Sequence, residues 1–266
     1  MRFIFITNNT DKARIADAAG VDSIFVDLER RGKAARQPDR KPWISDHSFD
    51  DISRIKRCLV NAELLVRIDP LGRDSKNQID SALGCGVNRL IIPMLRSYDE
   101  VQYSLELIDE RAKFCLLVET PELLASLYRV LERLPIDNVH LGLNDLSRAL
   151  GLTHMFELFA NGFAECFANI CKAQGVLFGI GGVSPVGMGE VSPNLLISEH
   201  ARLGSKQVIL SRAFNSLDLN QNIWRQEIDA LREIYCAPHN LSGRGQLSTQ
   251  LCSLIRESAE KLGKES

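Results

Sequence analysis

Charged side chains follow short apolar runs at several points in this sequence, and these are the places where chemistry could be built. Carboxylates come after such runs at Asp27, Glu29, Glu119 and Asp145, and Arg67 lies near the end of another. Any one of them alone could be a helix cap or a surface charge. If the runs are parallel strands, however, their ends meet at one rim and the side chains converge. Carboxylates without Cys or His beside them are typical ligands of a hard divalent cation, so the pattern predicts such a site next to an arginine.

The apolar runs also predict the elements that position these side chains. Each run is nearly continuous in Ile, Val, Leu and Phe, as expected for strands buried on both faces of a parallel sheet. The runs begin about 29 residues apart, which corresponds to one βα unit per step and to a (β/α)8 barrel. A doubly wound sheet is the competing fold, but it favours a glycine-rich first turn, and here that turn is Asn8-Asn9-Thr10. The eight runs are 3–7, 23–29, 63–69, 89–95, 113–119, 138–142, 176–182 and 207–212.

The barrel is predicted to occupy residues 1–236, and residues 237–266 to form a separate loop and helix. Within 246–262 apolar residues recur on one side of the predicted helix, as a stripe that must pack on something. The helix either covers its own barrel or crosses to a neighbouring subunit. The stripe consists of Leu247, Leu251, Leu254 and Ile255.

The composition argues against several broad classes of protein. The 32 Lys and Arg nearly balance the 34 Asp and Glu, which gives no general attraction to nucleic acid or to an anionic membrane. The seven cysteines contain no C-x-x-C pair, which argues against a zinc ribbon and against a secreted disulfide framework. The first apolar run is too short for a signal peptide, and no later run is long enough to span a membrane. We therefore expect a cytoplasmic protein without a nucleic-acid or membrane partner.

In this setting the chain resembles the HpcH/HpaI aldolase and citrate lyase β-subunit family. The resemblance lies in five segments, in this order: VDSIFVDLE, LLVRID, GVNRLIIPML, LLVETPE and HLGLNDLSRALG. It extends from about residue 16 to residue 213, and its most specific part is E-T-P-E followed by G-x-N-D-L. Members of this family are metal-dependent (β/α)8 lyases that form or cleave a carbon–carbon bond next to a 2-oxo acid or an acyl-CoA. The resemblance implies the same fold and this class of chemistry here.

The resemblance also implies roles for individual residues. Glu119 and Asp145 correspond to two protein ligands of Mg²⁺, or of Mn²⁺ or Co²⁺, and Arg67 corresponds to a contact with an oxygen of the 2-oxo acid. Glu29 corresponds to a neighbouring carboxylate that holds a water molecule or Arg67 in place. A metal with only two carboxylate ligands keeps positions open for the substrate and acts as a Lewis acid. Arg67 would add a second positive charge where the enolate develops.

Three further positions are predicted to bind anionic groups. The backbone N–H groups of Asn144 and Asp145, at a strand-to-helix junction, could hold the substrate carboxylate. The side chains of these two residues are also expected to cap a helix over 146–150. Arg212 follows the last predicted strand and is an anion-binding candidate, with an ion pair to a glutamate as the alternative.

The sequence departs from both branches of the family directly after Glu29. The aldolase branch has a histidine for acid–base work, with a carboxylate of the adjacent subunit beside it, where this chain has Arg30 and Gly84; the acyl-CoA branch has an acid in place of Arg30. Arg30 begins a basic run that is either a solvated loop or an anion-binding surface. We predict that Arg30 binds an anionic second substrate, and that protons pass through metal-bound water oriented by Glu29. The remaining members of the basic run are Arg31, Lys33 and Arg36.

Two histidines near the predicted rim are expected to be structural. His47 precedes the helical segment 50–62 and is expected at the N-terminus of that helix rather than as a catalytic base. His140 alternates with Gly142 on its strand, so it should point into the barrel, where a hydrogen-bonded core histidine is the simplest interpretation.

Three functions remain open on this evidence. The leading hypothesis is a divalent-metal-dependent aldolase or lyase that acts on a 2-oxo acid of the pyruvate or oxaloacetate type through a metal-bound enolate. The second is an acyl-CoA lyase or synthase of the citrate lyase type, and the third is a catalytically silent barrel with a binding role. The resemblance further implies a homo-oligomer in which the C-terminal helix packs on a neighbouring subunit.

Overall fold

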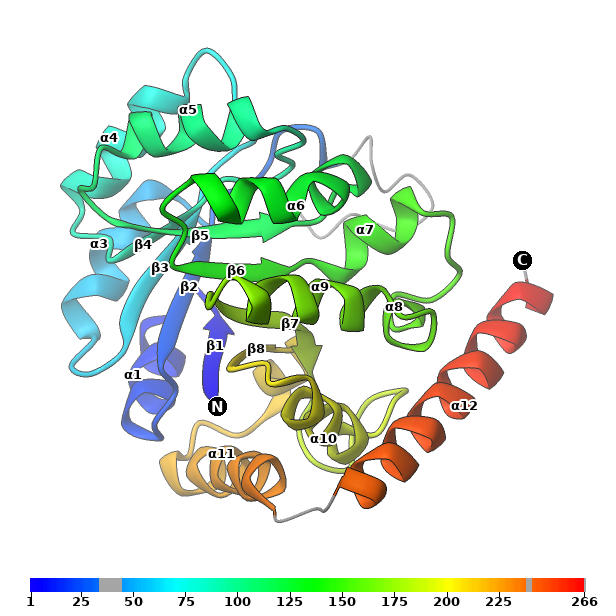
Figure 1. Ribbon diagram of the computed structural model, residues 1–266. Helices are drawn as coiled ribbons and strands as arrows, with labels where there is room; N and C mark the ends of the chain where they lie inside the picture. Colours follow the sequence, from blue (N-terminus) through cyan, green and yellow to red (C-terminus); the bar gives the residue numbers. More distant parts are fainter. Residues whose placement is uncertain (34–44, 238–240, 266) are drawn as a thin grey trace.

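A closed barrel of eight parallel strands forms the centre of the molecule (Figure 1). The structure is a computed structural model that describes residues 1–33, 45–237 and 241–265. Neighbouring strands follow chain order around the barrel, and β8 closes it on β1. The (β/α)8 prediction is therefore confirmed, with a strand in each of the eight apolar runs. The strands are β1 Arg2–Ile6, β2 Ser23–Asp27, β3 Glu63–Arg67, β4 Arg89–Ile91, β5 Lys113–Val118, β6 Asn138–Leu141, β7 Leu177–Val183 and β8 Gln207–Leu210.

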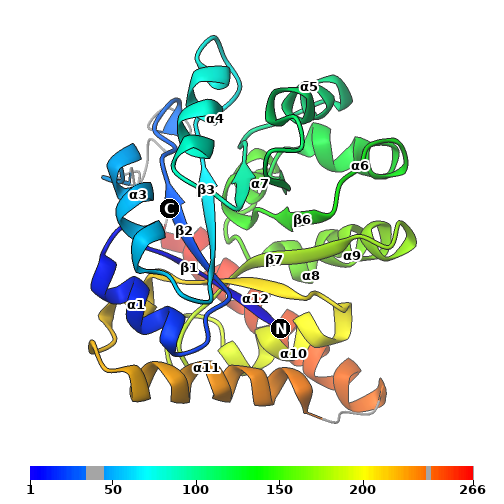
Figure 2. The ribbon, with the colours of Figure 1, turned by 90° about the vertical axis from the view of Figure 1, so that its left-hand side faces the viewer.

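Helices surround the barrel, as seen in the two views of Figures 1 and 2. One of them begins directly after Thr120, because the Thr120 hydroxyl accepts a hydrogen bond from the backbone N–H of Leu123 and Pro121 occupies the first turn. The helices are α1 Thr10–Ala18, α3 Phe49–Cys58, α4 Ser75–Gly84, α5 Tyr98–Ile108, α6 Pro121–Arg133, α7 Leu143–Ala149, α8 Glu157–Ala160, α9 Phe163–Ala173, α10 Pro193–Leu203, the 3₁₀ helix η1 Arg212–Ser216, α11 Gln221–Cys236 and α12 Leu241–Glu265.

Side-chain alternation along the strands determines what the barrel presents at its carboxyl end. An apolar layer inside the barrel includes Phe25, Leu65 and Leu117. Because side chains two residues apart on a strand point the same way, Asp27 and Arg67 must also point inward, one layer nearer the carboxyl ends of the strands. The register pairs Asp27 directly with Arg67 across β2 and β3. The barrel geometry thus creates a charged layer above an apolar one.

Two local differences from the sequence-based expectation lie at this rim. Strand β4 ends at Ile91 rather than near residue 95, because Pro93 has no N–H for the ladder and Met94 adopts a left-handed backbone with φ of 61°. Helix α7 begins at Leu143, with Gly142 as its N-cap residue. The expectation that Asn144 and Asp145 cap a helix starting at 146 is therefore wrong: both lie in the first turn of the helix.

The C-terminal helix α12 packs on α8 and α10 of its own chain. Leu251 and Ile255 of the predicted stripe are buried, Leu247 is half-buried, and Leu254 is exposed. Of the two arrangements left open by the sequence, the single chain shows the first, in which the helix covers its own barrel. Its exchange between subunits stays a prediction.

No helix among the described residues is both long and apolar enough to cross a membrane. All seven cysteines lie in the described part of the chain, and none of them forms a disulfide in this structure.

Candidate functional site

Four charged side chains form one buried cluster where β2 and β3 end. Both oxygens of Asp27 accept hydrogen bonds from Arg67: Oδ1 from Nε at 2.9 Å and Oδ2 from Nη2 at 2.8 Å. Arg67 Nη2 lies 3.2 Å from Glu29 Oε2. Lys33 completes the cluster, with its Nζ 3.1 Å from Asp27 Oδ2 and 3.5 Å from Glu29 Oε2. Two carboxylates and two cations thus balance their charges, and we call this set the ion quartet.

The ion quartet keeps Asp27 and Arg67 charged despite their burial. Burial alone would raise the pKa of Asp27, but Arg67 and Lys33 lower that pKa well below its usual range. Burial alone would lower the pKa of Arg67, but Asp27 and Glu29 raise it well above its usual value. The Arg67 guanidinium also lies 5.7 Å from the centre of the Phe25 ring, over the apolar layer of the barrel. The predicted contact between Glu29 and Arg67 is therefore present, with Asp27 as the stronger partner.

Glu119 lies beside the ion quartet, directly after β5, and is 4% exposed. Its Oε1 accepts a hydrogen bond from the backbone N–H of Met94 at 2.9 Å. Gly142 leaves room for the carboxylate on another side, because a Cβ at that position would lie 2.8 Å from Glu119 Cβ and 3.1 Å from Oε2. The pKa of Glu119 is raised to about 7: burial is the main cause, Glu29 and Asp145 also raise the pKa, and Arg67 and the hydrogen bond from Met94 lower it.

This arrangement suits a divalent cation better than it suits bare carboxylates. Glu119 and Asp145 act on each other as like charges at a buried position, and a cation between them would relieve both the repulsion and the cost of burial. Their oxygens are the donors that Mg²⁺ and Mn²⁺ prefer. Among residues 1–33, 45–237 and 241–265, no group of three or more His, Cys, Asp and Glu side chains could hold a metal ion. A cation held by Glu119 and Asp145 would therefore take its other ligands from water or substrate.

The two residues of α7 predicted to contact substrate lie at the same rim. Asp145 is half-buried and Asn144 is exposed, and both belong to the first turn of α7. Backbone N–H groups in a first helical turn have no acceptor within the helix. Neither side chain caps the helix, and the role of the two amides in holding an anionic group stays a prediction.

The two arginines predicted to bind anions are both exposed, but they differ in their contacts. The Arg30 guanidinium donates to the backbone carbonyl of His47 at 3.0 Å, and the Arg30 backbone N–H donates to Asp69. Arg30 therefore braces the loop before α3. Arg212, the first residue of η1, follows β8 and feels the charge of Asp27. Arg36 of the basic run lies outside the described residues.

The expectation of a solvated basic loop is wrong for Lys33. Its side chain is 8% exposed and belongs to the ion quartet. Gly32, with φ of 76°, provides a left-handed turn that brings the chain back toward the barrel. A glycine directly before a lysine in a basic run is the one sequence signal that could have indicated this return, and it is a weak one.

The two histidines behave as expected. His47 lies just before the N-cap residue Ser48 of α3, and its Nδ1 accepts a hydrogen bond from the backbone N–H of Asp27. His140 is buried inside the barrel, 3.3 Å from the Gly181 carbonyl and 3.4 Å from the Gln207 amide. Burial lowers the pKa of His140 to about 4, which keeps its ring neutral at ordinary pH.

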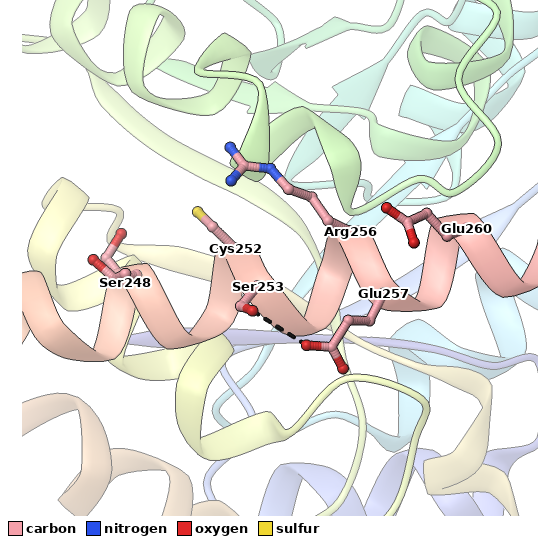
Figure 3. Close-up of a pocket in the computed structure, with 7 residues that line it drawn as sticks. Ser248, Cys252, Ser253, Arg256, Glu257 and Glu260 are labelled. Carbon is pink, nitrogen blue, oxygen red and sulfur yellow. Dashed lines mark hydrogen bonds between the residues drawn. The ribbon is translucent and has the colours of Figure 1, made fainter.

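A hollow of about 580 Å³ lies along α12 (Figure 3). All of its lining side chains come from this one helix, and the Ser253 hydroxyl donates to Glu257 within the same lining. Separate strands contribute nothing to it, whereas the rim combines residues from β2, β3, β5 and the segment after β6. The rim is therefore the candidate active site.

Comparisons with known proteins concern the fold and the family of the chain. No curated protein matches the chain in sequence. Among solved structures, an HpcH/HpaI aldolase from Desulfitobacterium hafniense DCB-2 aligns with 16% identity and a TM-score of 0.60, over 89% of this chain and 93% of that one. An HpcH/HpaI aldolase/citrate lyase family protein from Burkholderia cenocepacia J2315 aligns with 15% identity and a TM-score of 0.60, over 88% and 94%. The citrate synthase SbnG aligns with 14% identity and a TM-score of 0.61, over 87% and 91%.

At these identities the structural matches show the fold alone. The family model named HpcH/HpaI aldolase/citrate lyase, however, matches residues 3–180, which include β1 to β6, most of β7 and every residue of the ion quartet together with Glu119 and Asp145. The chain belongs to the HpcH/HpaI aldolase/citrate lyase family.

Proposed function

We propose that this protein is a divalent-metal-dependent aldolase or lyase that makes or breaks a carbon–carbon bond next to a 2-oxo acid. Family membership supports carbon–carbon lyase chemistry in general. The observation that supports the finer proposal is the buried Glu119 carboxylate beside Asp145, in a place that Gly142 keeps free of side chains. Mg²⁺, Mn²⁺ or Co²⁺ would be held by these two carboxylates. When bound, such an ion supplies a Lewis acid that withdraws electrons from the carbonyl of a 2-oxo acid.

The protein's own groups provide the rest of the environment for an enolate. Arg67 uses Nε and Nη2 for Asp27 and Glu29, and Nη1 has no hydrogen-bond partner in the described part of the chain. This nitrogen can donate to the oxygen that gains negative charge as the enolate forms. The backbone N–H groups of Asn144 and Asp145 can hold the carboxylate of the 2-oxo acid. The ion quartet fixes the position of Arg67, so that little reorganisation is needed during the reaction.

An anionic second substrate remains part of the proposal. Arg212 is exposed at the rim, where its guanidinium can bind a carboxylate or phosphate. Arg30 is exposed as well, and its guanidinium donates to the His47 carbonyl. Comparing anionic and neutral aldehydes of equal length, with Arg212→Ala and Arg30→Ala, measures the two contributions separately.

A thermal-shift matrix tests the proposed function. The ligands are Mg²⁺, Mn²⁺, pyruvate, oxaloacetate and acetyl-CoA, alone and in pairs, with Glu119→Gln as the matched variant. We expect a divalent ion to stabilise the wild type, a 2-oxo acid to add to that stabilisation, and Glu119→Gln to lose both effects. Stabilisation by acetyl-CoA without a 2-oxo acid would indicate the citrate lyase type of reaction instead. Stabilisation by none of these ligands would indicate a barrel with a binding role.

A further inference from the structure

Lys33 is a buried primary amine inside the candidate active site, and the mechanism described so far leaves it unused. Its Nζ lies 3.1 Å from Asp27 Oδ2 and 3.5 Å from Glu29 Oε2. An ammonium group has three hydrogens to donate. The Asp27 carboxylate accepts one of them, whereas Glu29 Oε2 is an ion-pair partner that receives no hydrogen bond. The other hydrogens of the Lys33 ammonium have no hydrogen-bond acceptor in the described part of the chain.

The order of charges across the rim places Lys33 away from the proposed cation. Glu119 interacts electrostatically with Arg67, Glu29 and Asp145. Lys33 contacts Asp27 and Glu29, the two carboxylates that also contact Arg67, and it is not among the groups that act most strongly on Glu119. The charged groups are therefore arranged across the site in this spatial order: Asp145 and Glu119 first, Arg67 and Glu29 next, and Lys33 last. The enolate would form beside the first group, so its reaction partner would have to approach over the second and third.

We propose that Lys33 is a catalytic residue that donates a proton to the carbonyl oxygen of the second substrate during carbon–carbon bond formation. This inference rests on the proposed function. In the addition direction, C3 of the enolate forms a bond to the carbonyl carbon of an aldehyde, and the electron pair of that carbonyl moves onto its oxygen. The oxygen takes a proton from Lys33 Nζ, which keeps the N–H electron pair as a neutral amine. The proton that leaves C3 goes to solvent water, one proton passes from Lys33 to the new hydroxyl, and the neutral amine takes up a proton from the solvent, so the whole cycle is proton-neutral.

In the cleavage direction the same atoms move in reverse. The neutral amine takes the hydroxyl proton, the carbon–carbon bond breaks, and its electrons return to the enolate. His47 is a poorer candidate for this transfer, because its Nδ1 already accepts the backbone N–H of Asp27. The charged groups that face Lys33 are Asp27 and Glu29 from β2 and its following turn, Arg67 from β3, and His47.

The first test separates the two half-reactions. Enolisation is followed as exchange of the pyruvate C3 protons in D₂O with Mg²⁺ present, and addition is followed as product formation from pyruvate and an aldehyde. Lys33→Arg keeps a positive charge but cannot give up its proton at neutral pH. We expect it to lower kcat for addition about a thousandfold, with little change in KM, and to lower C3 exchange by far less. Lys76→Arg, at an exposed lysine of α4, is the control.

Rescue of the addition rate by added amines distinguishes proton transfer by Lys33 from a purely structural role. In Lys33→Ala, added ethylamine should restore part of the addition rate. 2-Fluoroethylamine has a similar size but is a weaker base than ethylamine. It should restore the addition rate to a different extent than ethylamine does, because the rate then depends on how readily the added amine gives up its proton. Tetramethylammonium, which carries charge but no N–H, should restore nothing. If Lys33→Ala does not fold, Lys33→Arg and Lys33→Met carry the test.

Three results would overturn the assignment of Lys33. The first is that Lys33→Arg lowers the rates of C3 exchange and of addition equally, or lowers neither rate. The second is equal rescue by all three cations, which indicates a structural charge. The third is a covalent adduct of pyruvate on Lys33 trapped by borohydride, which indicates an imine mechanism. If instead the wild type with Mg²⁺ neither exchanges C3 protons nor forms product, the proposed function itself fails.

Discussion

The backbone N–H of Met94 donates to Glu119 Oε1 at 2.9 Å, from a residue with φ of 61°. A left-handed backbone is costly for a side chain other than glycine, by about 1–2 kcal/mol. Here it turns the N–H after Pro93 toward the carboxylate rather than into the sheet. The short β4 and the position of Glu119 therefore have one common cause.

Substitutions at Met94 should affect the metal affinity through this backbone conformation. Met94→Gly keeps the N–H and accepts a positive φ, so we expect Mn²⁺ affinity close to that of the wild type. Met94→Val places a β-branched residue at a position that disfavours it, and we expect affinity to fall about tenfold, with a lower Tm. Calorimetric titration with Mn²⁺ measures the affinity of each variant, and a thermal melt measures its Tm. Equal affinities in the two variants would show that the backbone of Met94 does not position Glu119.

Arg67 should prove important for both turnover and stability. Arg67→Ala removes a donor to the developing enolate, and we expect kcat to fall about a hundredfold to a thousandfold while KM changes less. It also leaves Asp27 buried with Lys33 as its remaining ion-pair partner in the described chain, so we expect a loss of about 3 kcal/mol in urea unfolding. Mn²⁺ binding should survive. A loss of stability without a loss of kcat would show that Arg67 only forms structural ion pairs and takes no part in the reaction.

The rim could be predicted from sequence because barrel geometry is simple. Strand periodicity and spacing gave eight strands, and alternation places Asp27 above Phe25 and Arg67 above Leu65. Lys33 could not be predicted in the same way, because its position depends on a tertiary turn at Gly32 rather than on any repeating pattern. Asn144 and Asp145 lie at the rim but not in the expected local role, since α7 begins at Leu143, three residues earlier than its polar residues suggest.

The interior histidine His140 should make folding stability depend on pH. Its pKa is lowered from 6.5 to about 4 by burial, so between these values the unfolded chain binds a proton that the folded protein does not. The stability that the neutral ring contributes is therefore complete above pH 6.5 and lost as the pH falls toward 4, by about 3 kcal/mol in total. His200, whose pKa burial lowers to about 3, acts in the same direction. Urea unfolding of metal-free protein between pH 4.5 and 7 should show a shallower slope for His140→Asn than for the wild type; identical slopes would contradict this.

The tail helix offers a test with an internal control. Leu251 is buried between α12 and the barrel helices, whereas Leu254 on the same helix is 40% exposed. Leu251→Ala should cost about 2–5 kcal/mol in urea unfolding if α12 packs on a barrel, and Leu254→Ala should cost much less. Light scattering of the same two variants tests the predicted homo-oligomer: if copies of the chain associate through the exposed side of α12, Leu254→Ala should weaken association. A wild-type monomer would contradict that part of the prediction.

The central claim is that Glu119 and Asp145 hold a divalent cation on which enolisation of a 2-oxo acid depends. The most direct measurement is proton NMR of the C3 protons of pyruvate in D₂O, with enzyme treated with EDTA and then titrated with Mg²⁺. We predict no exchange above background in EDTA, exchange that saturates with Mg²⁺, and none at the same Mg²⁺ concentration for Glu119→Gln and Asp145→Asn. Exchange that persists undiminished in EDTA, or in both variants, would contradict the account.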